Sequence, residues 1–141
     1  MIFVFESNLA GCHGRGAALE AVRFQGAKRG VGFGHEGQSF AIPTKDENFE
    51  RLPLAKINGY VRLFLEYARH HPELTFGLTP IGCSLAGYAP AQIAPMFESA
   101  PVNVILPYEL ALLWQNEDLL TRVGGSFALG FSRSATGGGL E

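Results

Sequence analysis

The sequence has little of what several classes of protein require. Lys plus Arg number 11 against 13 Asp plus Glu, a formal charge of -2, so no basic surface is available to follow a nucleic-acid backbone. No apolar run approaches the roughly 18 residues of a membrane span, and the N-terminus lacks the basic and apolar regions of a signal peptide. We therefore expect a cytoplasmic protein with no membrane association and no extended nucleic-acid binding surface.

Cysteine and metal-ligand patterns are also scarce. The two cysteines, Cys12 and Cys83, have no CxxC companion and cannot build a disulfide framework, which suits a reducing compartment. The four histidines share no metal-ligand spacing with cysteines or carboxylates, so neither a zinc site nor another cofactor is expected. A nucleophilic cysteine would need a base that the sequence does not place, and free cysteine is usually an inert small hydrophobe.

Apolar residues, by contrast, are abundant enough for one core. They make up 47% of 141 residues, which indicates a single domain, here assigned to residues 1–136. The closing glycine run with Leu140 and Glu141 is typical of a cloning remnant, so residues 137–141 are expected to be disordered or foreign to the fold.

Strand and helix patterns alternate along the chain. Short apolar runs predict strands at 2–5, 39–43, 74–79 and 102–107, with a further candidate at 127–129. Helical spacing and Pro or Gly boundaries predict helices at 17–24, 53–71, 91–99 and 108–123. The glycine-rich segment 26–37 is predicted as a loop that is either closely folded or mobile. This alternation predicts an α/β fold with a mixed, largely parallel sheet.

Two glycine loops follow predicted strands and precede predicted helices: the first glycine loop at residues 7–16 and the second at residues 80–88. Ligands in such folds bind at the carboxyl ends of the strands, and glycine lets the backbone approach a ligand closely. We expect binding through two sets of residues: Ser7, Asn8, Gly14, Arg15 and Gly16 in the first loop, and Gly82, Cys83, Ser84, Leu85, Ala86, Gly87 and Tyr88 in the second. The alternative is that both loops are only tight turns.

Lys45 and Asp46 directly follow the predicted strand 39–43, near the same edge of the sheet. A lysine there could pair with a phosphate or, if desolvated, act as an amine nucleophile. The alternative is a solvated loop lysine beside an acid.

Taken in order, three patches resemble a macrodomain, the fold that binds ADP-ribose, and in particular the class that removes terminal ADP-ribose from protein carboxylates. These patches are residues 7–17, 42–45 and 80–85. The chain is also similar to a phage-associated and bacterial family of unassigned role with the same patches. The resemblance spans about residues 5–105 and implies a three-layer α/β/α macrodomain-like fold that binds ADP-ribose or an ADP-ribosylated macromolecule.

The resemblance also implies roles for single residues. In the hydrolase class a lysine at the position of Lys45 attacks the anomeric carbon of the ribose, assisted by an aspartate. That aspartate position is Ala86 here, and Ser84 stands where the class has glycine, so Asp46 becomes the candidate acid or base. Phe33, Phe40 or Tyr88 could stack on a base, or each could belong to the core.

Three hypotheses of function follow. The first is an ADP-ribose-binding protein that hydrolyses an ADP-ribosyl bond through Lys45. The second is a non-catalytic reader or sponge for a nucleotide, which the alanine at position 86 favours. The third is a structural or partner-binding protein whose glycine loops are only turns and whose segment 107–114 contacts another subunit.

Overall fold

The computed structural model of the chain describes residues 1–112. The predicted strand at 127–129, the continuation of the last helix to residue 123, Trp114 and the segment 137–141 lie outside the described residues.

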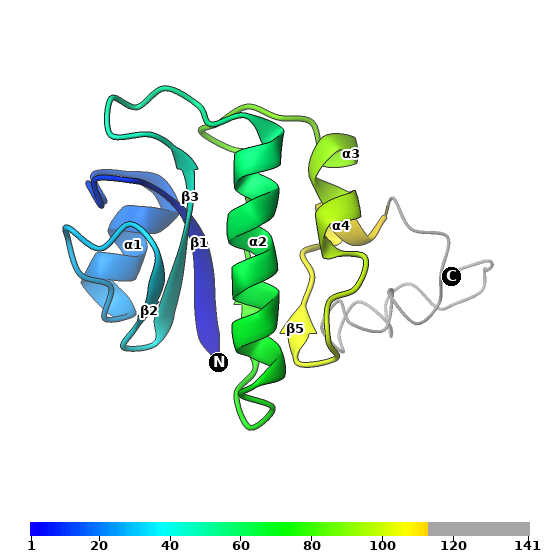
Figure 1. The fold of residues 1–141 in the computed structure, drawn as a ribbon. Coiled ribbons are helices and arrows are strands. Elements are labelled where there is room, and N and C mark those ends of the chain that lie inside the picture. The colour runs from blue at the N-terminus through cyan, green and yellow to red at the C-terminus, as the bar shows by residue number, and fades with distance from the viewer. Residues whose placement is uncertain (113–141) are drawn as a thin grey trace.

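One mixed sheet organises residues 1–112 (Figure 1). Its strands lie in the order β2-β3-β1-β4-β5, with bounds β1 Ile2–Asn8, β2 Gly34–Glu36, β3 Ser39–Lys45, β4 Phe76–Leu78 and β5 Val104–Ile105. β1 pairs in parallel with β3 and β4, β4 pairs in parallel with β5, and β2 is antiparallel to β3. The predicted α/β fold with a mixed, largely parallel sheet is therefore confirmed for this part of the chain.

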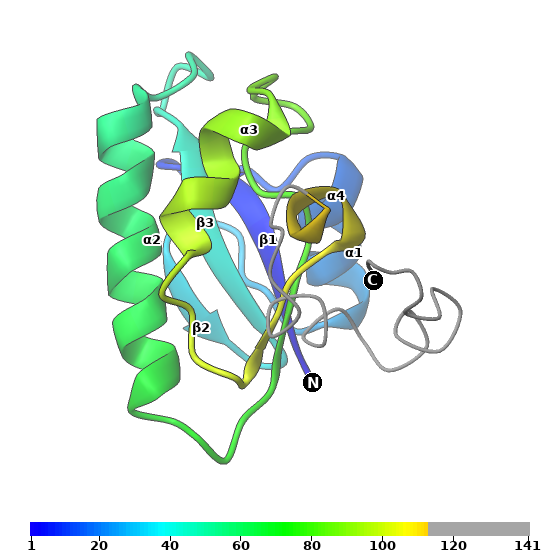
Figure 2. The same cartoon turned by 90° about the vertical axis from the view of Figure 1, so that its right-hand side faces the viewer.

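Helices cover both faces of this sheet. They are α1 Gly16–Phe24, α2 Leu54–Arg69, α3 Pro90–Ile93, the 3₁₀ helix η1 Ala94–Phe97 and α4 Tyr108–Ala111. Figure 2 shows α1 and α2 on opposite sides of the strands. None of the helices in residues 1–112 combines the length and the apolar character needed to cross a membrane.

Side-chain alternation along β3 explains the two covered faces. Phe40 and Ile42 pack in the larger core cluster with α2, whereas Ala41 packs with Phe5 and Ala21 of α1 in the smaller one. Successive residues of a strand point to opposite faces, so a continuous apolar run buries both. The resulting arrangement is helix, sheet, helix.

Two predicted elements differ from the structure. The segment 26–37 is not all loop, because Gly34–Glu36 forms β2 along the edge of β3. The helix predicted at 91–99 divides into α3 and η1. Pro95 lies at the start of η1 and has no N–H to continue an α-helical hydrogen-bond ladder.

The segment 26–37 supports the first glycine loop from outside the cleft described below. The Ser7 hydroxyl donates to the carbonyl of Gly32, and the Gly30 N–H donates to the carbonyl of Gly11 at 3.0 Å. A Cβ at Gly32 would lie 2.5 Å from the carbonyl oxygen of Asn8, so only glycine allows this approach. The segment 26–37 and the first glycine loop therefore pack in direct backbone contact.

His13 also links the first glycine loop to segment 26–37. Its ring is 1% exposed, packs edge-on against Phe5 at 5.2 Å, and its Nε2 lies 3.1 Å from the Val31 carbonyl oxygen. Because that carbonyl can only accept, Nε2 is the donor. Burial is the main cause that lowers the pKa of His13 below its usual value.

Candidate functional site

A cleft of about 330 Å³ opens where β1 and β3 end. Residues from three separate parts of the chain line it: Glu6, Ser7, Asn8, Cys12, Gly14, Arg15, Ala18, Thr44, Lys45, Phe49 and Leu85. Since β1, β3 and β4 are parallel, the segments that follow them meet at one edge of the sheet, as predicted.

All three sequence patches contribute to this cleft. Asn8, Gly14 and Arg15 come from the first patch, Lys45 from the second and Leu85 from the third. Asn8 and Lys45 are register partners on adjacent strands. The structure therefore brings together residues that lie up to about 80 positions apart in the sequence.

A second hollow of about 160 Å³ shares residues with the cleft, among them Glu6, Arg15 and Leu85. Gly16 and Ser84 line this hollow, together with the first turn of α1. Arg15 occupies the N-cap position without a side-chain cap, and the first turn carries no acidic residue. The first N–H groups of a helix have no partner within it and favour an anion. Arg15 and these N–H groups therefore favour an anion such as a phosphate in the hollow, whereas Glu6, which also lines it, opposes one.

The side chains of Ser7 and Asn8 shape the loop as well as lining the cleft. Both residues are buried. The Asn8 amide donates to the Cys12 carbonyl at 3.2 Å and accepts from the Cys12 N–H at 3.0 Å, while Ser7 is bonded to Gly32. These two predicted ligand contacts are therefore also the residues that hold the loop in its conformation.

An irregularity in β3 places Lys45. Ser7 is paired with Pro43 and Asn8 with Lys45, so Thr44 is an extra residue on β3. Such a bulge changes the direction of the side chains beyond it. Lys45 is half-buried in the cleft. Within residues 1–112 neither Lys45 nor Arg15 has an acidic side chain within ion-pair distance.

Glu6 is a cleft residue that sequence reasoning missed. Its Oε1 accepts a hydrogen bond from the Thr44 hydroxyl at 2.7 Å. Its Oε2 is buried and has no hydrogen-bond partner among the described residues. The available signal was a charged residue directly after the apolar run 2–5, at the carboxyl end of a central strand.

Asp46 forms a turn and does not line the cleft, and Phe49 has a role that the sequence did not indicate. Asp46 is not among the residues lining the cleft; its Oδ1 accepts from the N–H groups of Asn48 and Glu50 at 2.8 and 2.9 Å. This turn holds Phe49 at a φ of 65°, with its side chain 57% exposed at the cleft. A positive φ in a bulky residue is uncommon, and an aromatic residue within an acidic turn was the signal.

Most of the second glycine loop lies away from the two hollows. Gly82, Cys83, Ala86, Gly87 and Tyr88 line neither of them, whereas Leu85 lines both. Three backbone N–H groups of this loop bond within it, and these are Cys83 to Pro80, Gly87 to Ser84 and Tyr88 to Gly82. The structure therefore brings only part of this predicted binding loop to the cleft.

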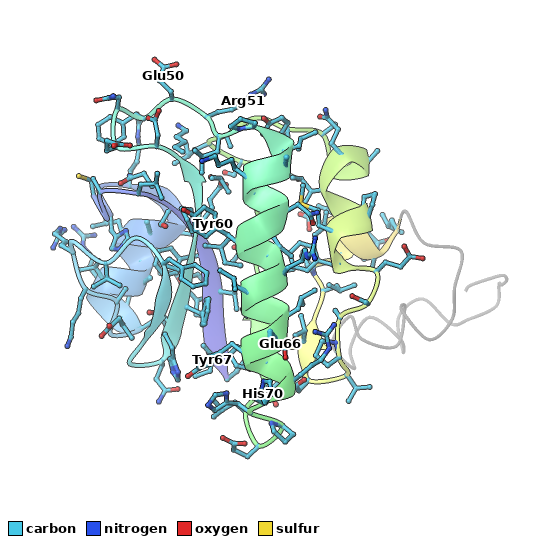
Figure 3. All side chains as sticks on the ribbon, in the orientation of Figure 1. Glu50, Arg51, Tyr60, Glu66, Tyr67 and His70 are labelled. Atoms are coloured by element: carbon cyan, nitrogen blue, oxygen red, sulfur yellow. The ribbon has the colours of Figure 1, made fainter. Side chains whose placement is uncertain are left out.

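Tyr88 connects the second loop to the start of α2. Its hydroxyl donates to the Leu52 carbonyl at 2.6 Å, and the Arg51 guanidinium lies 4.1 Å from its ring centroid. Figure 3 shows Arg51 at the N-terminal end of α2, where it also donates to the Ala86 carbonyl at 3.4 Å. Arg51 therefore occupies one face of the Tyr88 ring.

The other two aromatic candidates pack inside the protein. Phe40 is 1% exposed, and Phe33 packs edge-on against it at 5.4 Å. Of the aromatic residues described, Phe49 is the one that lines the cleft.

The cysteines differ in environment. Cys12 is exposed and lines the cleft. Burial, followed by the negative charges of Glu6 and Glu109, raises the pKa of the Cys83 thiol, which disfavours the nucleophilic thiolate. Within the part of the chain described, no three His, Cys, Asp or Glu residues are grouped so that they could hold a metal ion.

Comparisons of the chain with protein-family models, with curated proteins and with solved structures find no match.

Proposed function

We propose that this protein binds a phosphorylated nucleotide sugar of the ADP-ribose type in the cleft at the carboxyl ends of β1 and β3, as a macrodomain-like protein. The observation that carries the proposal is that Arg15, Lys45 and Leu85, one from each patch of the resemblance, line the same cleft. The parallel strands bring the three segments to one sheet edge, and a cleft there that carries two cations favours a ligand site over tight turns alone.

The charges and the backbone suggest where each part of the ligand lies. The phosphates occupy the hollow at the start of α1, near Arg15 and Ser84, because unpaired N–H groups and a guanidinium both favour an anion. The terminal ribose lies in the cleft beside Lys45. Phe49 offers an exposed ring on which a planar part of the ligand can stack.

Hydrolysis through Lys45 is the second part of the proposal. The Lys45 ammonium first loses a proton to water, and the free amine attacks the anomeric carbon of the terminal ribose. A C–N bond forms as the C–O bond to the glutamate carboxylate breaks, and the carboxylate leaves. Water then adds to the anomeric carbon and breaks the C–N bond, which releases ADP-ribose and the lysine amine. Lys45 lines the cleft and has no carboxylate within ion-pair distance in residues 1–112, so no acid of that region holds its ammonium in place.

Binding is tested by thermal-shift titration of the purified protein with ADP-ribose, ADP, AMP, NAD and ribose 5-phosphate. A ligand at about 100 times its dissociation constant stabilises the folded state by about 2.7 kcal/mol. We expect ADP-ribose to raise the melting temperature more than AMP or ribose 5-phosphate does. Absence of a shift with all five ligands would contradict the proposal.

Turnover is tested on a peptide carrying ADP-ribose on a glutamate. We expect Lys45→Ala to abolish release of ADP-ribose while ADP-ribose binding, measured by calorimetry, is largely retained. Lys56→Ala is the matched control, because Lys56 is an exposed lysine on α2 that does not line the cleft. A Lys45→Ala protein as active as the unmodified chain would exclude the lysyl mechanism.

A non-catalytic binding module is the second candidate function. Ala86 stands at the position of the hydrolase aspartate, is 6% exposed, and its carbonyl accepts from Arg51. ADP-ribose binding without turnover by the unmodified protein would identify this function.

A further inference from the structure

Glu6 has an environment that packing alone does not explain. Among the described residues that line the cleft it is the only acid, and it shares the cleft with the cations Arg15 and Lys45. It continues the face of β1 that carries Ile2 and Val4, both of which pack in the larger core cluster. An apolar side chain would fit that alternation, so packing does not explain why a carboxylate occupies this position.

The two carboxylate oxygens of Glu6 differ in their partners. Oε1 accepts a hydrogen bond from Thr44 at 2.7 Å, whereas Oε2 is buried without a partner among the described residues. A buried acceptor without a donor destabilises the folded state. Rotation about the terminal bond of a glutamate only exchanges its two oxygens between the same two positions. The Thr44 hydroxyl therefore holds the carboxylate in place whichever oxygen accepts it, and the Glu6 side chain lines the cleft.

The chemistry of the cleft limits which ligand groups the Glu6 carboxylate can bind. A phosphate at neutral pH offers acceptors and a negative charge, and a carboxylate repels it. A sugar hydroxyl donates a hydrogen bond to a carboxylate, and such a charge-assisted bond is stronger than one between neutral groups. A ligand with both phosphate and sugar hydroxyls would satisfy Arg15, Lys45 and Glu6 together.

We propose that Glu6 determines specificity, accepting a hydrogen bond from a hydroxyl of the terminal ribose and so selecting sugar phosphates over ligands that end in phosphate. This inference rests on the proposed binding of a nucleotide sugar. Thr44 is a positioning residue, because its hydroxyl donates a hydrogen bond that holds one oxygen of Glu6.

The test compares ADP-ribose with ADP, which lacks the terminal ribose, by isothermal titration calorimetry. Glu6→Gln keeps the shape and an oxygen for Thr44 but replaces the charged acceptor by a neutral amide. We expect affinity for ADP-ribose to fall about tenfold. Affinity for ADP should stay the same or rise, because a negative charge near the phosphates is removed.

Glu47→Gln provides the matched control, since it makes the same change of charge at an exposed position outside the cleft. We expect it to leave both affinities unchanged. If Glu6→Gln does not fold, Glu6→Asp decides the question: it keeps the charge but draws the oxygens back by one methylene, and should weaken ADP-ribose selectively.

The outcomes separate this inference from the proposed function. Equal changes in the two affinities on Glu6→Gln, or no change in either, would overturn the role of Glu6 and leave ADP-ribose binding established. Failure of the unmodified protein to bind ADP-ribose would overturn both. If Glu6→Gln loses the preference for ADP-ribose over ADP and Glu47→Gln keeps it, the role of Glu6 in specificity is supported.

Discussion

Gly32 allows the sharpest test of how segment 26–37 packs against the first glycine loop. A Cβ at this position would lie 2.5 Å from the Asn8 carbonyl oxygen and 2.8 Å from that of Leu9. Both of these atoms belong to the backbone, so no side-chain rotation can relieve the contact. Gly32→Ala must therefore separate the segment 26–37 from the first glycine loop.

The magnitude follows from the contacts that such a separation disturbs. Overpacking of this kind typically costs about 1–3 kcal/mol. Weakening the bonds from Ser7 to Gly32 and from His13 to Val31 adds about 1 kcal/mol each. We expect Gly32→Ala to lower the free energy of unfolding by about 3–5 kcal/mol, which corresponds to a fall of roughly 12–20 °C in melting temperature.

The same substitution elsewhere should have the opposite sign. Gly59 lies in the interior of α2, and a Cβ there would meet no atom within 4 Å. Gly59→Ala should raise the free energy of unfolding by about 0.5–1 kcal/mol, because alanine is the better helix former. Urea unfolding followed by circular dichroism measures both variants. If the free energy of unfolding of Gly32→Ala lies within about 0.5 kcal/mol of that of the unmodified chain, the close backbone contact at Gly32 is refuted.

Two further predictions concern His13 and Phe49. Since burial lowers the pKa of folded His13, the unfolded chain binds the proton more readily, and stability should fall as pH drops below about 6.5 toward the folded pKa. His13→Gln should lose that part of the pH dependence in urea unfolding between pH 7.5 and 5, and His70→Gln should keep it. Phe49 has a φ of 65°, a conformation that glycine adopts more readily than alanine. Phe49→Gly should therefore have a free energy of unfolding about 1 kcal/mol higher than that of Phe49→Ala. Equal stability of the two variants would show that the residue is unstrained.

The elements that the sequence predicted well are those with a local cause. The spacing of Ile57, Val61 and Phe64 predicts α2, and proline and glycine mark the ends of the helices and strands. The placement of both glycine loops at one sheet edge followed from the alternation of strands and helices. Such signals depend on residues a few positions apart.

β2 had no local signal, because three residues within a glycine-rich segment form a strand only when β3 offers an edge to pair with. The position of most of the second glycine loop away from the cleft likewise depends on tertiary contacts, among them the contact of Arg51 with Tyr88, which come together from different segments.

By itself, then, the sequence determined the α/β class, the main helices and the patches that converge on the cleft, because hydrophobic periodicity and backbone restrictions are written locally. Only the tertiary structure decided which side chains face that cleft. The bulge at Thr44 sets the direction of Lys45, and the turn made by Asp46 sets that of Phe49. The close backbone contact at Gly32 sets the position of the first glycine loop. Each of these depends on hydrogen bonds or close contacts whose geometry no sequence spacing specifies.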